Sequence, residues 1–368
     1  MNEKSIGAAV MTVSEMVRCL SKSYSAIINS GISLKKHPSV MLWGAPGVGK
    51  SQGVRQIAAA IEQNTGKCVS ITDVRLLLFN PVDLRGIPTA NAEKTLAVWL
   101  KPQIFQMDES ENIINVLFLD EISAAPPSVQ AAAYQITLDR TVGEHKLPDN
   151  CIVIAAGNRV TDKSVAYNMP RALANRLCHI EIVTDEVSWH NWAVKSNINN
   201  KVIAFLDYSP EFLISEENQA DTIAYCTPRS WEMVSNILNF VSEDINGIFP
   251  IIVGCIGEEG AYSFKAWYDV YARLPSVKAI FHGEVLNVPT KPEILYALTG
   301  EILIYAKENK SAEEMKNALS FISKFPREFR NKLFEDLLTV KHMIHVLQNN
   351  AVFDDWFARS GRRWESYE

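Results

Sequence analysis

The stretch SVMLWGAPGVGKSQ, residues 39–52, is the most informative part of this chain. Its first five residues form a short apolar run typical of a buried strand, and a helical pattern begins near residue 51. Between them, Gly44–Ser51 has the spacing G-x-x-x-x-G-K-[ST] of a phosphate-binding loop. Glycines in such a loop let backbone N–H groups turn toward phosphate oxygens at a helix N-terminus. An ordinary glycine-rich turn is the alternative, and the flanking strand and helix argue against it.

The loop predicts particular contacts with a nucleotide and its metal ion. Lys50 is expected to reach the β- and γ-phosphates, and Ser51 to bind Mg²⁺. ATP is the expected nucleotide, and GTP stays open because adenine contacts come from variable backbone segments. The residues expected to bind the nucleotide are Gly44, Ala45, Pro46, Gly47, Val48, Gly49, Lys50, Ser51 and Gln52.

Further short apolar runs follow the loop, at 68–74, 115–120, 151–156 and 179–183, with helical segments between them. Such runs, separated by helices, are typical of parallel strands that are buried on both faces. We therefore predict an α/β fold, with a parallel five-stranded sheet flanked by helices. Beyond about residue 187 only helical patterns follow, and residues 8–33 also have the pattern of one or two amphipathic helices.

Composition limits the classes of function. The 368 residues include 36 Lys and Arg against 42 Asp and Glu, a net charge of −6, which argues against a broad nucleic-acid or acidic-lipid surface. The six cysteines form no C-x-x-C pair and indicate a reducing compartment. No stretch approaches the roughly 18 apolar residues of a membrane helix. We expect a cytoplasmic protein without a membrane partner.

Polar residues follow two of the predicted strands. NVLFLDEI places Asp120 and Glu121 at the carboxyl end of one strand, where ligands of open α/β sheets bind. Asp120 is expected to hold Mg²⁺, and Glu121 to orient and polarise the water that attacks the γ-phosphate. CIVIAAGN ends a later strand in Asn158, whose neutral amide can hydrogen-bond both the γ-phosphate and this water. Strand-end caps without a catalytic role are the alternative.

The order of phosphate loop, strand-end Asp-Glu, later strand-end Asn and helix-borne Arg resembles that of the AAA+ ATPases. Residues 120–158 and the segment TPRSW, 227–231, are similar to the MoxR group of that family, and the resemblance covers roughly residues 35–245. It implies a Mg²⁺-dependent ATPase that assembles into a ring, with a hexamer as the expected size, and remodels a protein client. It also implies a von Willebrand A-domain partner. The predicted organisation is an N-terminal helical segment over 1–35, an AAA+ α/β domain over 36–186, a helical lid over 187–245 and a helical extension over 246–368.

The resemblance assigns roles to three arginines. Arg176, in ANRL, falls where the MoxR group carries Asp-Arg-Phe, so it is expected to reach the nucleotide of a neighbouring subunit as an arginine finger. Here Asn175 and Leu177 replace the flanking residues. Arg171, at a place where an acidic residue is common, is a second candidate for such a contact. Arg229, at the first turn of a helix in the predicted lid, is expected to contact the γ-phosphate within its own subunit. Helix-end arginines that meet carbonyls and solvent are the alternative.

Two insertions, residues 83–105 and 139–150, look like hairpins that face a substrate or partner in the same group. Inert surface loops are the alternative. Two other functions also stay open at this stage. One is an AAA+ protein that acts on nucleic acid, such as a loader or restriction-type motor, and the other is a nucleotide-gated scaffold. The acidic net charge disfavours the first, and the intact Asp120-Glu121 pair disfavours the second.

Overall fold

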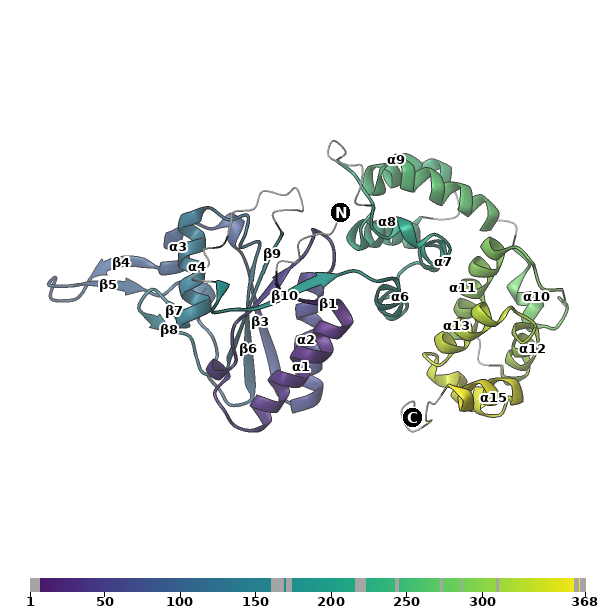
Figure 1. The fold of residues 1–368 in the computed structure, drawn as a ribbon, viewed down its shortest axis with the longest axis horizontal. Coiled ribbons are helices and arrows are strands. Elements are labelled where there is room, and N and C mark those ends of the chain that lie inside the picture. The colour runs from purple at the N-terminus through teal and green to yellow at the C-terminus, as the bar shows by residue number, and fades with distance from the viewer. Residues whose placement is uncertain are drawn as a thin grey trace. The chain divides into compact units, whose positions relative to one another are not determined.

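The computed structural model describes residues 7–159, 169, 174–215, 223–241, 245–271, 274–285, 287–308, 311–360 and 364. The chain divides into two compact units, Met1–Ser188 and Trp189–Glu368. The first holds the sheet, and the second is helical (Figure 1). Among the helices of the described ranges, none has both the length and the apolar character needed to cross a bilayer.

The first unit is built on a six-stranded sheet in which every pair of neighbours is parallel. The strand order is β1-β10-β2-β9-β6-β3, so the strand that precedes the phosphate loop lies inside the sheet. Because all strands are parallel, their carboxyl ends meet at one edge, where ligands of such sheets bind. The strands are β1 (Ala9–Thr12), β2 (Val40–Trp43), β3 (Cys68–Arg75), β6 (Ile113–Asp120), β9 (Cys151–Gly157) and β10 (Cys178–Val183).

The predicted parallel α/β core is confirmed, with one strand more than the five expected. The extra strand is β1, which lies inside the segment 8–33 that was predicted to be entirely helical. That part of the prediction was wrong because Ala9–Thr12 pairs in parallel with Ile180–Val183, a long-range contact that a local pattern does not contain. The helix α1 (Val13–Asn29) begins immediately afterwards, where Thr12 and Glu15 form a capping box.

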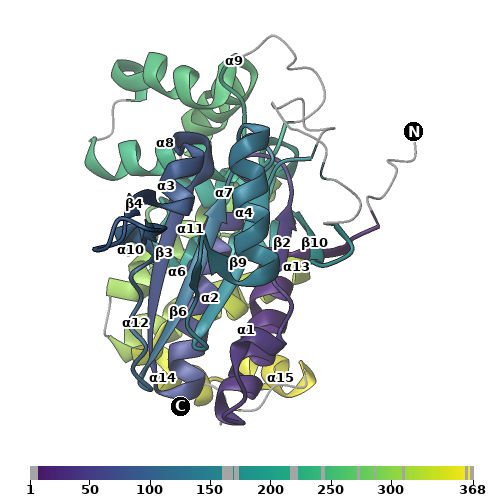
Figure 2. The same cartoon turned by 90° about the vertical axis from the view of Figure 1, so that its left-hand side faces the viewer.

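Helices cover both faces of the sheet (Figures 1 and 2). On one face α1 packs against α2 so closely that a Cβ on Gly53 would lie 2.3 Å from Cε of Met16. On the other face α4 lies over an apolar cluster that includes Leu117 of β6 and Val153 of β9, both fully buried. The α2 helix, which begins at the phosphate loop, is therefore held in place by its packing against α1. Among the described residues of this unit, the α-helices after α1 are α2 (Lys50–Thr65), α3 (Pro81–Arg85) and α4 (Pro127–Asp139).

Two antiparallel hairpins extend from this unit, and both fall within the insertions that were predicted to be hairpins. The first joins β4 (Ile87–Ala90) to β5 (Ala97–Leu100) and projects away from the sheet (Figure 1). The second joins β7 (Thr141–Val142) to β8 (His145–Lys146) and turns at Gly143 and Glu144.

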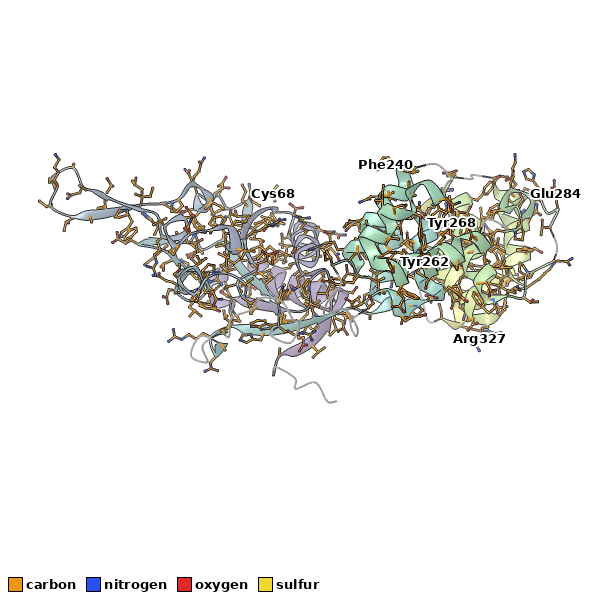
Figure 3. The ribbon with its side chains drawn as sticks, turned by 90° about the horizontal axis from the view of Figure 1, so that it is seen from above. Cys68, Phe240, Tyr262, Tyr268, Glu284 and Arg327 are labelled. Carbon is orange, nitrogen blue, oxygen red and sulfur yellow. The ribbon has the colours of Figure 1, made fainter. Side chains whose placement is uncertain are left out.

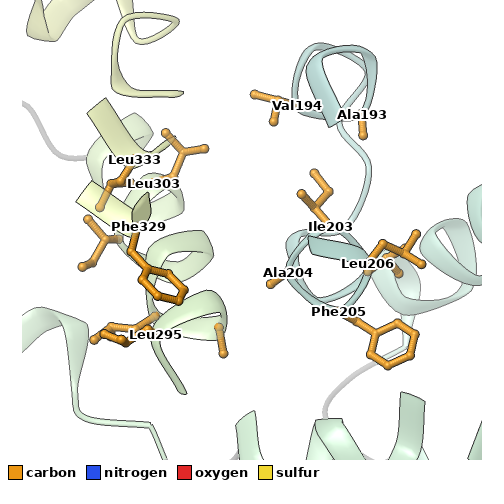
Figure 4. Close-up of a cluster of buried hydrophobic side chains, with 14 of the residues drawn as sticks. Ala193, Val194, Ile203, Ala204, Phe205, Leu206, Leu295, Leu303, Phe329 and Leu333 are labelled. Carbon is orange, nitrogen blue, oxygen red and sulfur yellow. The ribbon is translucent and has the colours of Figure 1, made fainter. Parts of the chain in front are cut away.

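The second unit is all-helical and is organised around one apolar cluster that runs from Trp189 to Phe357 (Figure 4). The proposed lid, 187–245, and the proposed extension, 246–368, contribute to the same cluster. Thr227 caps α8 by accepting from the N–H of Ser230, with Pro228 at the first turn. The helices are α6 (Glu186–Lys195), α7 (Asn200–Tyr208), α8 (Pro228–Phe240), α9 (Ile245–Tyr271), α10 (Val277–Phe281), α11 (Pro292–Glu308), α12 (Ala312–Ile322), α13 (Arg327–Leu337), α14 (Ile344–Gln348) and α15 (Ala351–Arg359).

A buried charged group joins three of these helices. His190 of α6 contacts Asp207 of α7 through Nδ1 at 2.9 Å and Asp336 of α13 through Nε2 at 3.0 Å. Lys332 forms an ion pair with Asp207 at 2.5 Å. Burial lowers the pKa of His190, but the hydrogen bonds and charges of the two aspartates outweigh it and raise this pKa to about 9. The imidazolium therefore links the proposed lid to the proposed extension at neutral pH.

This arrangement predicts that the second unit loses stability in mild alkali. Because the folded pKa of His190 lies above its ordinary value near 6.5, its contribution is full below pH 6.5 and is lost as the pH rises through about 9. We expect His190→Gln to lower the free energy of unfolding at pH 6 by about 3 kcal/mol and to remove most of this pH dependence. Denaturant unfolding followed by tryptophan fluorescence measures it, because six of the eight tryptophans follow residue 188.

His345→Gln is the matched control, since His345 is exposed. An equal stability difference between wild type and His190→Gln at pH 6 and pH 10 would contradict the charged state assigned to His190.

Candidate active site

The backbone of the phosphate loop depends on glycine at two positions. Gly44, directly after β2, has φ 155°, and a Cβ there would lie 2.8 Å from the carbonyl oxygen of Ile182. Gly49 has φ 99° and occupies the N-cap of α2, where no side chain accepts a hydrogen bond from the first turn. The N–H groups of that turn therefore point toward the loop, together with the positive end of the helix dipole. This is a site suited to the phosphates of a nucleotide.

Lys50 connects the loop to a neighbouring strand. Its side chain is buried, and its ammonium donates to the carbonyl oxygens of Gly44 at 2.6 Å and Ala45 at 3.0 Å. It also donates to Oδ1 of Asn158 at 3.0 Å, directly after β9. The two residues lie more than a hundred positions apart in the sequence, and the parallel pairing of β2 with β9 brings them together. A cation is thus held over the loop with a neutral amide beside it.

Ser51 and Asp120 form a second pair at the same edge of the sheet. The hydroxyl of Ser51 donates to Oδ2 of Asp120 at 2.8 Å, and Oδ1 of Asp120 accepts from the N–H of Glu121 at 2.8 Å. Asp73, on the adjacent strand β3, has a raised pKa because of burial and the charge of Asp120. One hydroxyl and one carboxylate beside a phosphate site fit Mg²⁺, which takes few protein ligands and completes its shell with phosphates and water. Within the described ranges, no three His, Cys, Asp or Glu residues gather into a separate metal site.

The segment after β6 is held by the end of β9 and by the residue that follows it. The backbone at Glu121 adopts φ 58°, in the left-handed region, which is uncommon for a residue with a side chain. The N–H of Ile122 donates to the carbonyl oxygen of Ala156 at 2.9 Å, and Oγ of Ser123 accepts from the N–H of Asn158 at 2.9 Å. These bonds fix the backbone on the carboxyl side of Glu121, and they join the segment that carries Glu121 to the one that carries Asn158.

Ser123 was not singled out by the sequence, although its place after the Asp-Glu pair was a usable signal. A second missed contact is the ion pair between Arg159 and Glu181, with Nη1 and Oε1 2.6 Å apart and both side chains mostly buried. A glutamate inside the apolar strand HIEIV was the signal for it. This pair attaches the segment that carries Asn158 to β10.

The three arginines have different positions. Arg176 lies in the first unit, is exposed, and occupies a turn just before β10. Arg171 lies outside the described residues. Arg229 lies in the second unit, exposed at the first turn of α8. The structure thus brings Lys50, Ser51, Asp120, Glu121 and Asn158 together at one edge of the sheet.

Comparison with known proteins agrees with this geometry. Residues 39–179 match the family described as "ATPase family associated with various cellular activities (AAA)", a range that begins before the phosphate loop and ends in β10. The chain carries an AAA ATPase domain. This ATPase domain contains all five of the residues gathered at the sheet edge. No curated protein matched the chain.

Two solved structures are similar to the whole chain at a low level. NtrX from Brucella abortus in complex with ATP is 12% identical, with a TM-score of 0.36, over 100% of this chain and 69% of that one. A RuvB mutant from Thermotoga maritima is 13% identical, with a TM-score of 0.34, over 95% of this chain and 87% of that one. These scores carry no argument about activity, so the assignment of the ATPase domain rests on the family match.

Proposed function

We propose that this protein is a Mg²⁺-dependent ATPase of the MoxR type, which assembles into a ring, with a hexamer as the expected size, and remodels a protein client. The observation that carries this proposal is the joining of the two hairpins on the ATPase domain. Nε2 of His145 in the second hairpin donates to the carbonyl oxygen of Trp99 in the first at 2.8 Å. Gly143, with φ 58°, lies so close to the first insertion that a Cβ would be 2.6 Å from the carbonyl oxygen of Arg85.

In the proposed reaction, the first turn of α2 and Lys50 bind the phosphates of ATP. Ser51 and Asp120 would hold Mg²⁺, which when bound would supply Lewis-acid stabilisation of charge on the phosphate oxygens. Glu121 orients a water molecule and accepts its proton while the water oxygen bonds to the γ-phosphorus and the bond to the β-phosphate oxygen breaks. Asn158, placed by Ser123 and Lys50, hydrogen-bonds the γ-phosphate and this water through its amide group.

The role of Ser51 can be tested through the metal requirement. Ser51→Ala removes the hydroxyl that lies 2.8 Å from Asp120, so we expect the Mg²⁺ concentration for half-maximal turnover to rise about 10-fold to 100-fold. Ser51→Thr keeps the hydroxyl and should stay close to wild type. Steady-state phosphate release at fixed ATP, titrated with Mg²⁺, measures both. Identical Mg²⁺ curves for wild type and Ser51→Ala would remove Ser51 from the metal site.

We assign Arg176 the role of arginine finger for the adjoining subunit. An exposed guanidinium on a fixed turn can supply positive charge to the γ-phosphate of a neighbour without being desolvated in its own subunit. Arg171 is the second candidate for this contact, and Arg229 is proposed to contact the γ-phosphate of its own subunit from α8. These assignments follow from the family resemblance and from position in the chain.

The client surface is proposed to lie on the first hairpin. Its strands expose a cross-strand apolar pair, Ile87 at 64% and Leu100 at 57%, and Leu96 at its tip is 67% exposed. Clustered exposed apolar side chains of this kind mark sites that bind other proteins. A von Willebrand A-domain partner is proposed by family analogy alone.

All six cysteines are free, including the exposed Cys68 labelled in Figure 3, which supports a reducing, cytoplasmic location.

The hairpin surface leads to a capture experiment. Glu121→Gln protein with bound ATP is expected to retain its client during affinity purification, and adding Leu96→Ser and Leu100→Ser should reduce the retained amount about 10-fold or more, because burial of two leucines contributes about 3 kcal/mol. Val352→Ser, an exposed apolar residue of α15, is the control. Equal retention with and without the two hairpin substitutions would exclude this surface. Turnover stimulated by DNA instead of protein would favour the nucleic-acid alternative.

A further inference from the structure

Trp43 lies at the point where the central strand becomes the phosphate loop. It is the last residue of β2 and directly precedes Gly44, whose carbonyl oxygen accepts from Lys50. Its indole Nε1–H donates to Nδ1 of His179 on the neighbouring strand β10 at 2.9 Å. The planes of the two rings are nearly parallel, at 15° to each other, and their centroids lie 6.1 Å apart. The base of the loop is therefore attached to β10 by a side-chain contact in addition to the backbone ladder.

His179 makes a second contact through its other nitrogen. Nε2 lies 2.7 Å from the carbonyl oxygen of Ala174. An indole N–H can only donate and a carbonyl oxygen can only accept, so Nδ1 must be the acceptor and Nε2 must carry the proton. Both nitrogens of a neutral ring are thus used, in a single tautomer. In this state His179 links the side chain of Trp43 to the backbone of Ala174 through two hydrogen bonds.

Ala174 begins the turn that carries Arg176. Its carbonyl oxygen also accepts from the N–H of Leu177 at 3.2 Å, which closes the turn around Arg176. Leu177 is only 9% exposed and belongs to the apolar cluster of the ATPase domain. The turn is therefore fixed at one side by His179 and at the other by a buried leucine, while Arg176 between them is exposed.

We infer that Trp43 and His179 are positioning residues, which hold the Arg176 turn in register with the phosphate loop of the same subunit. This inference rests on the proposed role of Arg176 as the finger for an adjoining subunit. A guanidinium must be placed accurately to stabilise charge on a transferring phosphoryl group, and a misplacement of about 1 Å can cost about 10²-fold in rate. Neither Trp43 nor His179 touches the nucleotide in this mechanism.

A complementation experiment separates this role from simple packing. Arg176→Ala subunits keep a working pocket but lack the finger, and Glu121→Gln subunits keep the finger but have an inactive pocket. Co-assembly of the two is expected to restore ATP turnover at pockets that receive a finger. Adding His179→Phe to the Glu121→Gln subunit should lower the restored rate by about 10-fold to 10²-fold. The same substitution in the Arg176→Ala subunit should leave the restored rate unchanged.

Two further variants sharpen the result. His179→Gln keeps one acceptor and one donor and should retain most of the restored rate when placed in the finger-donating subunit. Trp43→Phe keeps an aromatic ring but removes the indole N–H, so it should reduce the rate there. Trp43→Phe decides the outcome in case the His179→Phe subunit does not fold, as judged by its thermal melting.

The possible failures are distinguishable. No restored turnover on mixing the two parent subunits would overturn the proposed finger, and the inference with it. Restored turnover that is insensitive to His179→Phe in the finger-donating subunit would overturn only the positioning role. An equal loss with His179→Phe in either subunit would assign His179 to the pocket and would also overturn it.

Discussion

Replacing Glu121 by Gln is expected to lower ATP turnover about 10²-fold to 10⁴-fold and to leave ATP binding almost unchanged. The amide has the shape of the carboxylate but cannot accept the proton of the attacking water, and general-base catalysis contributes about this much to a rate. ATP binding should persist because Lys50, Ser51 and the first turn of α2 are untouched. Steady-state phosphate release and calorimetric titration with ATP measure the two properties separately.

Glu144→Gln makes the same chemical change in the exposed turn of the second hairpin and is the matched control. Its turnover should equal that of wild type. Turnover by Glu121→Gln within a few-fold of wild type would show that another group activates the water. The position of Glu121, with φ 58° beside Asp120, would then need a structural explanation.

Replacing Arg176 by Ala is expected to lower kcat about 10³-fold or more, in the range that arginine fingers contribute in other NTPases. The affinity for ATP should change little, because Arg176 lies on an exposed turn and contacts only the nucleotide of an adjoining copy in the proposed ring. Turnover is measured as a function of protein concentration, since a pocket completed by a second subunit requires assembly. Sedimentation in the presence of ATP should report an unchanged ring.

Arg327→Ala, an exposed arginine of α13 labelled in Figure 3, is the control for loss of surface charge. Wild-type chains that turn over ATP at full rate as monomers would refute the finger. A normal kcat for Arg176→Ala in an intact ring would move the role to Arg171, which the same assay can examine.

Much of the candidate site could be predicted because its residues follow strands. Asp120 and Asn158 each end a strongly apolar run, and parallel strands with helical crossovers must bring their carboxyl ends to one edge of the sheet. The spacing of Gly44–Ser51 likewise predicted a loop that opens a helix, and α2 begins at Lys50. These features depend on local patterns and on a general rule of sheet topology, so no knowledge of particular long-range contacts was needed.

Other features depended on contacts that no local pattern contains. The segment 9–12 became a strand only because the edge of β10 was open to it, whereas its sequence also suits a helix. The hydrogen bonds from Trp43 through His179 to Ala174 depend on which strand lies beside β2. The ion pair of Arg159 with Glu181 depends on how the segment after β9 meets β10.

By itself, the sequence determined the phosphate loop, the parallel sheet and the polar residues at its carboxyl edge, because apolar periodicity and strand ends are properties of short segments. Only the tertiary structure decided the edge partner of β10, the joining of the two hairpins and the use of both nitrogens of His179. In each case the local sequence pattern is compatible with several contact partners, and the folded structure contains one of them. The energy that selects one of them comes from packing and hydrogen bonds between residues far apart in the chain.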